Sequence, residues 1–353
     1  MIDGIDVVAL PLAYSNRTSL GRRAWIFLKF AWRSMGIALR WEYDLLFATS
    51  TPLTAALPGI AMKLFRRCKP FVFEVRDLWP ELPRALGMKN PLMLGGMSVL
   101  EWLGYRTADA CVALAPGIAD GIRHRAPPGR RIVTISNGCD LALFTPKKRR
   151  SPLILPGVEP GDFVAGFTGA HGIANGLDAV LDAAAELRRR GRHDIKLVLI
   201  GDGNQKDRLV GRARAEGLSN CLFFPPVKKS EIARITASFD CGLQILADVP
   251  AFYRGTSPNK FFDYIACGIP VVTNYAGWLA DMIGRDGCGL VVPAAAPAAL
   301  ADALARLAGD SELRAVLGRN ARMLAEQKFD RNILAASWVS VLEAFVENAD
   351  YIE

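Results

Sequence analysis

Short runs of β-branched and apolar residues alternate with longer amphipathic stretches from about residue 40 onward. Strands are expected at residues 45–48, 71–75, 110–114, 132–135, 163–168, 195–200, 222–224, 241–246, 270–273 and 289–292. Helices are expected between them, for example at 178–190 and at 297–308, where Pro297 suits a first helical turn. This alternation predicts repeated βα units on parallel sheets that are covered on both faces.

The chain has 353 residues, which is more than one hydrophobic core usually organises, so two domains are expected. The best linker candidate is the segment 145–161, which holds four prolines and a run of four basic residues. The sequence therefore predicts a first domain at 1–150, a second at 151–328, and a C-terminal helix in 329–353 that packs back toward the first.

Charge is distributed unevenly along the chain. Residues 1–150 hold 22 basic and 11 acidic side chains, whereas the rest holds 21 and 24, so the net charge of +8 is concentrated in the first part. This asymmetry indicates an anionic partner such as a membrane surface, a nucleic acid or an acidic substrate. A nucleic acid is not expected, because no recognisable module interleaves aromatic and basic residues.

The cysteines and histidines give no pattern of a metal site or a disulfide framework. The seven cysteines are scattered without CxxC spacing, and the three histidines are far apart in sequence. We expect reduced thiols in a cytoplasmic protein and no metal. No signal peptide is expected, because Asp3 and Asp6 lie where a basic and then an apolar segment would be needed.

Residues 22–41 predict a basic amphipathic helix. At 100° per residue the basic side chains fall near one line, while the tryptophans share another face with leucine and methionine. A helix of this kind is expected to lie in the headgroup plane of an anionic membrane rather than to span it. The alternative is a surface helix that packs on its own domain.

A glycine-rich turn follows the run at 163–168 and reads Gly166-Phe-Thr-Gly169-Ala-His171-Gly172. It precedes a helix expected from about Leu177. Glycines here let backbone amides approach a phosphate at a helix N-terminus. The spacing is not GxGxxG, so a plain chain reversal remains open.

A second turn, Gly201-Asp202-Gly203, follows the run at 195–200 directly. It would lie at the carboxyl end of a strand, where open α/β sheets bind their ligands. An ordinary tight turn is the alternative.

The third segment reads Arg-Gly-Thr-Ser-Pro-Asn-Lys-Phe-Phe-Asp-Tyr-Ile-Ala-Cys-Gly-Ile-Pro-Val-Val. We expect Pro258 in the first turn of a helix, with Thr256 or Ser257 as its N-cap. Lys260 and Asp263 are three residues apart and share one face near the helix start. The cation and the free amides could hold a diphosphate, and the carboxylate could accept hydrogen bonds from ribose hydroxyls. A capped helix with a surface ion pair is the alternative.

This third segment resembles the nucleotide-sugar signature of the retaining glycosyltransferases of family 4, especially the branch that builds bacterial O-antigen and capsule-like polysaccharides. Four other motifs occur in the order expected of that family, at 73–81 (FEVRDLWPE), 135–144 (ISNGCDLALF), 168–178 (TGAHGIANGLD) and 199–203 (LIGDG). The resemblance implies the GT-B fold, an α/β architecture with two Rossmann-like domains facing a cleft. Relatives carry a strand and a helix before this point, and the resemblance leads us to expect an N-terminal domain that lacks them before Asp3.

Carried over by position, the family pattern implies a role for several residues. Asp263 stands at the second acid of the E-x7-E motif, which contacts the donor ribose, and Gly255 stands at the first acid. Ala170 and Asn175 stand where relatives have the basic pair that binds the diphosphate. Another source of positive charge is therefore needed.

Arg254 and Lys260 are the candidates for this charge. The His-Asp pair of the first domain is here Arg76-Asp77, and Arg76 cannot act as a general base because its pKa is above about 12. We expect Arg76 to contact phosphate or acceptor. The catalytic candidates are Asp77, Arg76 and Lys260. The donor-binding candidates are Gly169, His171, Gly172, Gly201, Asp202, Gly203, Arg254, Thr256, Ser257, Pro258, Asn259 and Asp263.

The resemblance implies a retaining transfer without an essential metal or other cofactor. The expected donor is a nucleoside-diphosphate sugar, with UDP favoured, and the expected acceptor is a lipid-linked or polysaccharide chain at the cytoplasmic face of the cell membrane. Two kinds of alternative stay open. One is a non-catalytic partner in a polysaccharide assembly complex, and the other is a nucleotide-sugar epimerase or a phosphorylase on the same fold.

Overall fold

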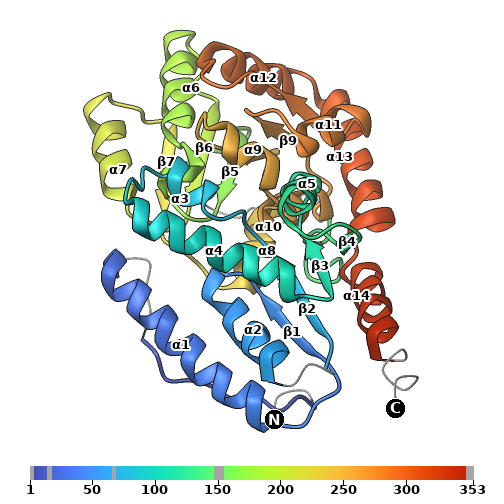
Figure 1. Cartoon of the computed structure of the whole chain (residues 1–353). Helices are drawn as coiled ribbons and strands as arrows, with labels where there is room; N and C mark the ends of the chain where they lie inside the picture. The colour runs from blue at the N-terminus through green and yellow to red at the C-terminus, as the bar shows by residue number, and fades with distance from the viewer. Residues whose placement is uncertain (1–3, 14–17, 66–68, 147–154, 347–353) are drawn as a thin grey trace. The chain divides into compact units, whose positions relative to one another are not determined.

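The computed structural model describes residues 4–13, 18–65, 69–146 and 155–346. Contacts divide the chain into two compact units (Figure 1). Unit 1 comprises Met1–Ile135 with Trp338–Glu353, and unit 2 comprises Ser136–Ser337. Each unit is built around one parallel sheet, so both are Rossmann-like α/β domains.

Unit 1 contains a four-stranded parallel sheet in the order β1-β2-β3-β4. Its strands are β1 Leu46–Thr49, β2 Phe71–Val75, β3 Ala110–Ala113 and β4 Arg131–Thr134. Every residue of the two central strands is buried, as expected for parallel strands covered on both faces.

The helices of unit 1 pack around this sheet. They are α1 Leu20–Arg40, α2 Ala56–Phe65, α3 Glu81–Ala85, α4 Pro91–Thr107 and α5 Pro116–Arg125, with the 3-10 turn η1 Leu53–Ala55. Helix α1 packs on α2, and α2 packs on α4 (Figure 1). The last helix, α14 Arg331–Val346, ends in this unit, where the Trp338 ring meets Phe47 edge-on at 5.1 Å between centroids.

Unit 2 contains a six-stranded parallel sheet in the order β10-β9-β8-β5-β6-β7. Its strands are β5 Phe163–Thr168, β6 Ile195–Ile200, β7 Cys221–Phe224, β8 Cys241–Gln244, β9 Val271–Thr273 and β10 Gly289–Val291. The chain builds outward from β5 to β7, then returns to place β8 on the other side of β5. The strand order therefore reverses between β5 and β8, which is the point where such sheets bind ligands.

The helices of unit 2 connect these strands. They are η2 Ile173–Asn175, α6 Asp178–Arg189, α7 Lys206–Ala215, α8 Lys229–Thr236, α9 Pro250–Gly255, α10 Asn259–Ala266, α11 Trp278–Arg285, α12 Pro297–Gly309 and α13 Ser311–Leu324, which a π-helical turn at Ala325–Phe329 extends.

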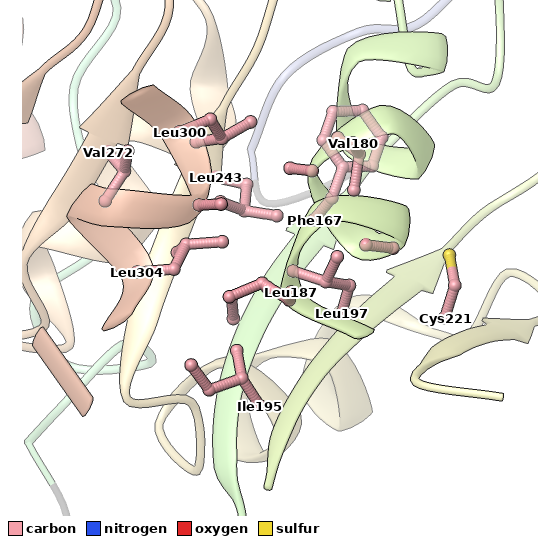
Figure 2. Packing of buried hydrophobic residues seen from close by; sticks show 14 of the residues in the cluster. Phe167, Val180, Leu187, Ile195, Leu197, Cys221, Leu243, Val272, Leu300 and Leu304 are labelled. Atoms are coloured by element: carbon pink, nitrogen blue, oxygen red, sulfur yellow. The ribbon is translucent and has the colours of Figure 1, made fainter. Parts of the chain in front are cut away.

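The core of unit 2 lies between the sheet and helices α6 and α12 (Figure 2). This core includes Phe167 and Leu197 of the strands, Leu187 of α6 and Leu304 of α12, and all four side chains are fully buried. Burial of such a side chain contributes roughly 1.5–3 kcal/mol. This core fixes where β5 ends, and the turn that follows β5 is the first part of the candidate site.

The expected strands are all present, with ends that differ by at most two residues. The expected domain boundary differs from the division by contacts, because the segment after Ile135 packs with unit 2: the Cys139 amide donates to the Phe329 carbonyl at 2.8 Å. The basic run at 147–150 lies outside the described residues.

Among the described residues, Cys111, Cys139, Cys221, Cys241, Cys267 and Cys288 are buried free thiols. Cys68 lies outside them. None of the described helices has the length and apolar character needed to cross a bilayer.

Candidate functional site

Two turns face each other at the carboxyl ends of β5 and β6. The Gly169 amide donates to the Ile200 carbonyl at 2.9 Å. Gly201 has φ +150, and a Cβ at this position would lie 1.9 Å from the Gly169 carbonyl oxygen. Only glycine fits there, and the two glycine turns found in the sequence therefore form one packed unit.

Within the first turn, only some amides are free to bind a ligand. The His171 amide donates to the Asp202 carbonyl at 2.9 Å, so neither it nor the Gly169 amide is available. The amides of Ala170 and Gly172 have no acceptor in the part of the chain that the structure describes. These two donors lie between the end of β5 and the start of η2.

The His171 side chain is buried rather than open to a ligand. It is fully buried, between the Phe167 and Phe223 rings at centroid distances of 6.0 and 6.1 Å. Neither ring nitrogen has a hydrogen-bond partner among the described residues. Burial, reinforced by the nearby Lys206 ammonium, lowers the pKa of His171 to about 4. The imidazole is thus neutral and supports the turn from beneath.

Lys260 crosses from the β8 side to this turn. Its Nζ lies 3.9 Å from the centroid of the Phe167 ring. The same Nζ donates a hydrogen bond to Asn175 Oδ1 at 3.0 Å. Asn175 Nδ2 in turn donates to the Ala170 carbonyl at 2.8 Å. A Cβ on Gly169 would lie 3.4 Å from that Nζ. No carboxylate pairs with Lys260 among the described residues, and burial lowers its pKa to about 7. The site therefore has an uncompensated cation beside free amides.

Asp263 lies one turn further along α10. Its carboxylate is half-buried and has no hydrogen-bond or ion-pair partner within the described ranges. Burial raises the pKa of Asp263 to about 7. An unpaired carboxylate of this kind can accept hydrogen bonds from hydroxyl groups of a ligand.

The start of α10 differs from the prediction. The helix begins at Asn259, Pro258 is its N-cap, and no side chain caps it. Ser257 is instead held by Asn137, whose backbone amide donates to Ser257 Oγ at 3.1 Å and whose Nδ2 donates to the Ser257 carbonyl at 2.5 Å. The Ser257 hydroxyl was expected to cap α10, but it accepts a hydrogen bond from Asn137, which is distant in sequence.

The other end of that loop is also tied down. The Thr256 carbonyl accepts a hydrogen bond from Trp278 Nε1 at 2.7 Å. Arg254 is exposed in the last turn of α9, and its side chain has no partner among the described residues. The amides of Asn259 and Lys260 likewise have no acceptor there, as is usual for a helix N-terminus.

Sequence reasoning missed three supporting residues. Asn137 lies in the motif at 135–144, but nothing in that motif predicted its contact with Ser257. Lys206 donates to the Gly201 and Phe224 carbonyls at 2.6 and 2.8 Å, which joins the ends of β6 and β7. Trp278 had no signal in the sequence.

Arg76 and Asp77 belong to unit 1, at the carboxyl end of β2. The Arg76 amide donates to Ser50 Oγ at 2.8 Å, and its guanidinium lies 3.5 Å from Glu74. Asp77 is half-buried, and this burial raises its pKa although the Arg76 charge opposes the shift. A carboxyl group in such a setting can exchange protons closer to neutral pH than an ordinary aspartate can.

A buried ion pair holds the loop that follows Asp77. The Trp79 amide donates to Glu101 Oε1 at 2.8 Å, and Arg125 bonds both Glu101 and Glu81 as well as the Trp79 carbonyl. Glu101 is fully buried. No group of three histidine, cysteine or acidic residues among those described is placed to hold a metal ion.

Comparison with known families covers most of the chain. Residues 6–143 match the family described as Glycosyltransferase Family 4, and residues 156–324 match the family described as Glycosyl transferases group 1. Each match spans less than half of the chain, and both are to glycosyltransferase families. The two matched segments hold the candidate residues of unit 1 and unit 2 respectively.

Curated proteins that are similar to the chain carry a more specific name. The chain is 31% identical over 220 residues to a D-inositol 3-phosphate glycosyltransferase of Paenarthrobacter aurescens. The alignment covers 61% of this chain and 52% of that protein. A protein of the same name from Saccharomonospora viridis is 30% identical over 234 residues, covering 62% and 49%. The chain thus spans about half the length of the curated relatives it matches.

Solved structures share the fold. Sucrose-phosphate synthase from Thermosynechococcus elongatus superposes with a TM-score of 0.78 at 18% identity, over 96% of this chain and 82% of that one. Anabaena HepE, crystallised with UDP-glucose, gives a TM-score of 0.72 at 20% identity, over 93% and 84%. These likenesses establish that the chain has the GT-B fold.

Proposed function

We propose that the chain is a retaining glycosyltransferase that takes its sugar from a nucleoside-diphosphate sugar. The observation that carries this proposal is the Lys260 ammonium, which has no carboxylate partner among the described residues and lies beside free amides at the strand-order reversal. Asp263, one turn along the same helix, supplies a free carboxylate for the ribose. UDP is favoured as the nucleotide, since the similarly folded HepE was crystallised with UDP-glucose.

The chemistry follows from where negative charge develops. As the bond to the sugar breaks, the leaving diphosphate gains charge, and Lys260 with the amides of Ala170 and Gly172 would stabilise it without reorganising. Arg254 is free to add a second positive charge. In unit 1, Asp77 is the proposed catalytic carboxylate and Arg76 the proposed contact to acceptor or phosphate. The retained configuration rests on family resemblance.

Transfer assays with a labelled UDP-sugar test the proposal. Lys260→Ala should lower kcat/KM by a factor of about 100 or more, as loss of one charge-stabilising donor does elsewhere. The control is Lys328→Ala, which removes the same charge from an exposed ion pair with Asp286 in unit 2. An unchanged rate for Lys260→Ala would remove this residue from the mechanism. If the donor sugar is epimerised and no sugar is transferred to an acceptor, the epimerase alternative would be favoured.

The proposed acceptor is a lipid-linked saccharide of O-antigen or capsule type at the cytoplasmic face of the membrane. Helix α1 supports a membrane location because it buries small side chains and exposes large apolar ones. The small Ala31 and Ala38 are buried, whereas Trp25 and Trp32 are 67% and 75% exposed. A helix that only completed its own domain would bury its largest apolar side chains.

Basic residues flank the exposed tryptophans, and each can contribute about 1 kcal/mol on an anionic surface. Sedimentation with phosphatidylglycerol vesicles should pull down the protein, and phosphatidylcholine vesicles should do so much less. A Trp25→Ser, Trp32→Ser variant should lose this binding and keep its thermal stability. Equal sedimentation of variant and parent would contradict the assignment.

The names of the curated relatives favour a second acceptor. D-Inositol 3-phosphate should therefore be assayed beside a lipid-linked acceptor. Transfer to the inositol phosphate alone would replace the lipid-linked part of the proposal and leave the donor part intact. No transfer to either, with intact nucleotide binding, would favour a non-catalytic partner.

A further inference from the structure

A basic pocket in unit 1 lies almost entirely outside the motifs of the sequence, since Pro80 alone of its lining residues belongs to one. It has a volume of about 390 Å³ and is lined by the α3–α4 connection, by one face of α4 and by the end of α5. Pro80, three residues after Asp77, forms part of its wall, as does Arg125. The pocket thus adjoins the loop that carries the proposed catalytic carboxylate.

The charge of this pocket is not fully compensated. Arg125 is paired with Glu81 and Glu101. Arg84 and Lys89 line the same pocket, and neither side chain has an acidic or hydrogen-bonding partner within the described ranges. The Ser98 hydroxyl on the pocket wall also has no partner there. Two free cations and a hydroxyl around one cavity are suited to an anion with several oxygens.

An exposed apolar stripe borders the pocket on α4. The pocket wall uses Leu94, Gly95 and Ser98, which share a helix face. The adjacent stripe contains Leu92 and Val99, which are 87% and 58% exposed, and continues to Trp102 at 45%. A soluble surface helix normally places charged side chains at such positions. The neighbourhood therefore suits a ligand with an anionic group and an apolar chain.

We propose that this pocket binds the phosphate or diphosphate of a lipid-linked acceptor, with the lipid chain along the exposed face of α4. This inference rests on the proposed function, because the ligand is an acceptor only if the protein is a glycosyltransferase. A phosphate held by Arg84 and Lys89 would leave the attached sugar near the loop of Asp77. The pocket would then distinguish a phosphate-linked acceptor from a free sugar.

Calorimetric titration of the full chain tests binding without requiring catalysis. The probe is farnesyl diphosphate in a zwitterionic detergent, and inorganic diphosphate, D-inositol 3-phosphate and phosphatidylglycerol vesicles form the comparison arms. The double variant Arg84→Gln, Lys89→Gln should weaken farnesyl diphosphate binding at least about tenfold, since two charge-assisted contacts are lost. The matched control is Arg123→Gln, an exposed arginine that pairs with Asp120 outside the pocket.

A steric variant tests the pocket without changing charge. A Cβ on Gly95 would meet no atom within 4 Å, so Gly95→Gln should fold normally and fill the cavity. It should weaken farnesyl diphosphate by a similar factor. UDP-glucose binding should stay unchanged in all variants, which separates failure of this inference from failure of the donor proposal.

Three results would overturn the inference. The first is unchanged farnesyl diphosphate binding by both pocket variants. The second is equal affinity for inorganic diphosphate or tighter binding of D-inositol 3-phosphate, since either would mean a site for a soluble phosphate. The third is a double variant that loses only its binding to phosphatidylglycerol vesicles. That result would mean that Arg84 and Lys89 bind the headgroups of the bulk membrane lipid.

Discussion

Nucleotide-sugar binding should have a bell-shaped pH dependence centred near pH 7. Burial places the pKa of Lys260 and that of Asp263 both at about 7 in the free protein. A bound diphosphate favours charged Lys260, so affinity is lost as pH rises through 7. Ribose hydroxyls favour ionised Asp263, so affinity is lost as pH falls through 7. Only about a quarter of the molecules have both charges at pH 7, which is the maximum.

This fraction sets the size of the effect. It falls about threefold at one pH unit from the maximum and about 25-fold at two units. Equilibrium titration with UDP-glucose from pH 5 to 9 measures it, because this phosphodiester has no phosphate that titrates near neutrality. Lys260→Arg should remove the alkaline limb, since arginine stays charged, and Asp263→Asn should remove the acid limb. A flat profile, or a variant that removes the wrong limb, would refute the reasoning.

Three further predictions concern stability. Gly201→Ala places a Cβ 1.9 Å from the Gly169 carbonyl oxygen at φ +150, so urea unfolding should show a loss of about 1–3 kcal/mol or more, and an unchanged midpoint would be inconsistent with the close turns. Asp263→Asn should raise Tm more at pH 8 than at pH 5, because the penalty of a buried carboxyl grows as pH rises from the ordinary aspartate value of 3.8 to the folded value of about 7; equal shifts at both pH values would contradict this. Glu101→Gln should cost toward the lower end of about 3–5 kcal/mol, since Arg125 keeps a second carboxylate, while UDP-glucose affinity stays the same.

The sheets could be predicted from sequence because buried parallel strands are continuous apolar runs. Residues 71–75 and 163–168 are buried along their whole length, and their expected limits were correct. The glycine turns and the pair of Lys260 and Asp263 could be predicted for a similar reason, since local spacing at a strand end or a helix start fixes their placement.

Contacts between distant segments could not be predicted in this way. Ser257 was a plausible helix cap by local rules, but Asn137, 120 residues earlier, uses its hydroxyl instead. The expected boundary near residues 145–161 relied on proline and charge, whereas the Cys139 contact to Phe329 decides where the segment packs. No spacing rule would have gathered Arg84 and Lys89 around one pocket.

A crystal structure of the chain with UDP would test the donor assignment most directly. We expect a diphosphate within hydrogen-bond distance of Lys260 Nζ and of the Ala170 and Gly172 amides, with the ribose hydroxyls on Asp263. A nucleotide bound elsewhere, or a diphosphate that leaves Lys260 and Asp263 without contact, would contradict it.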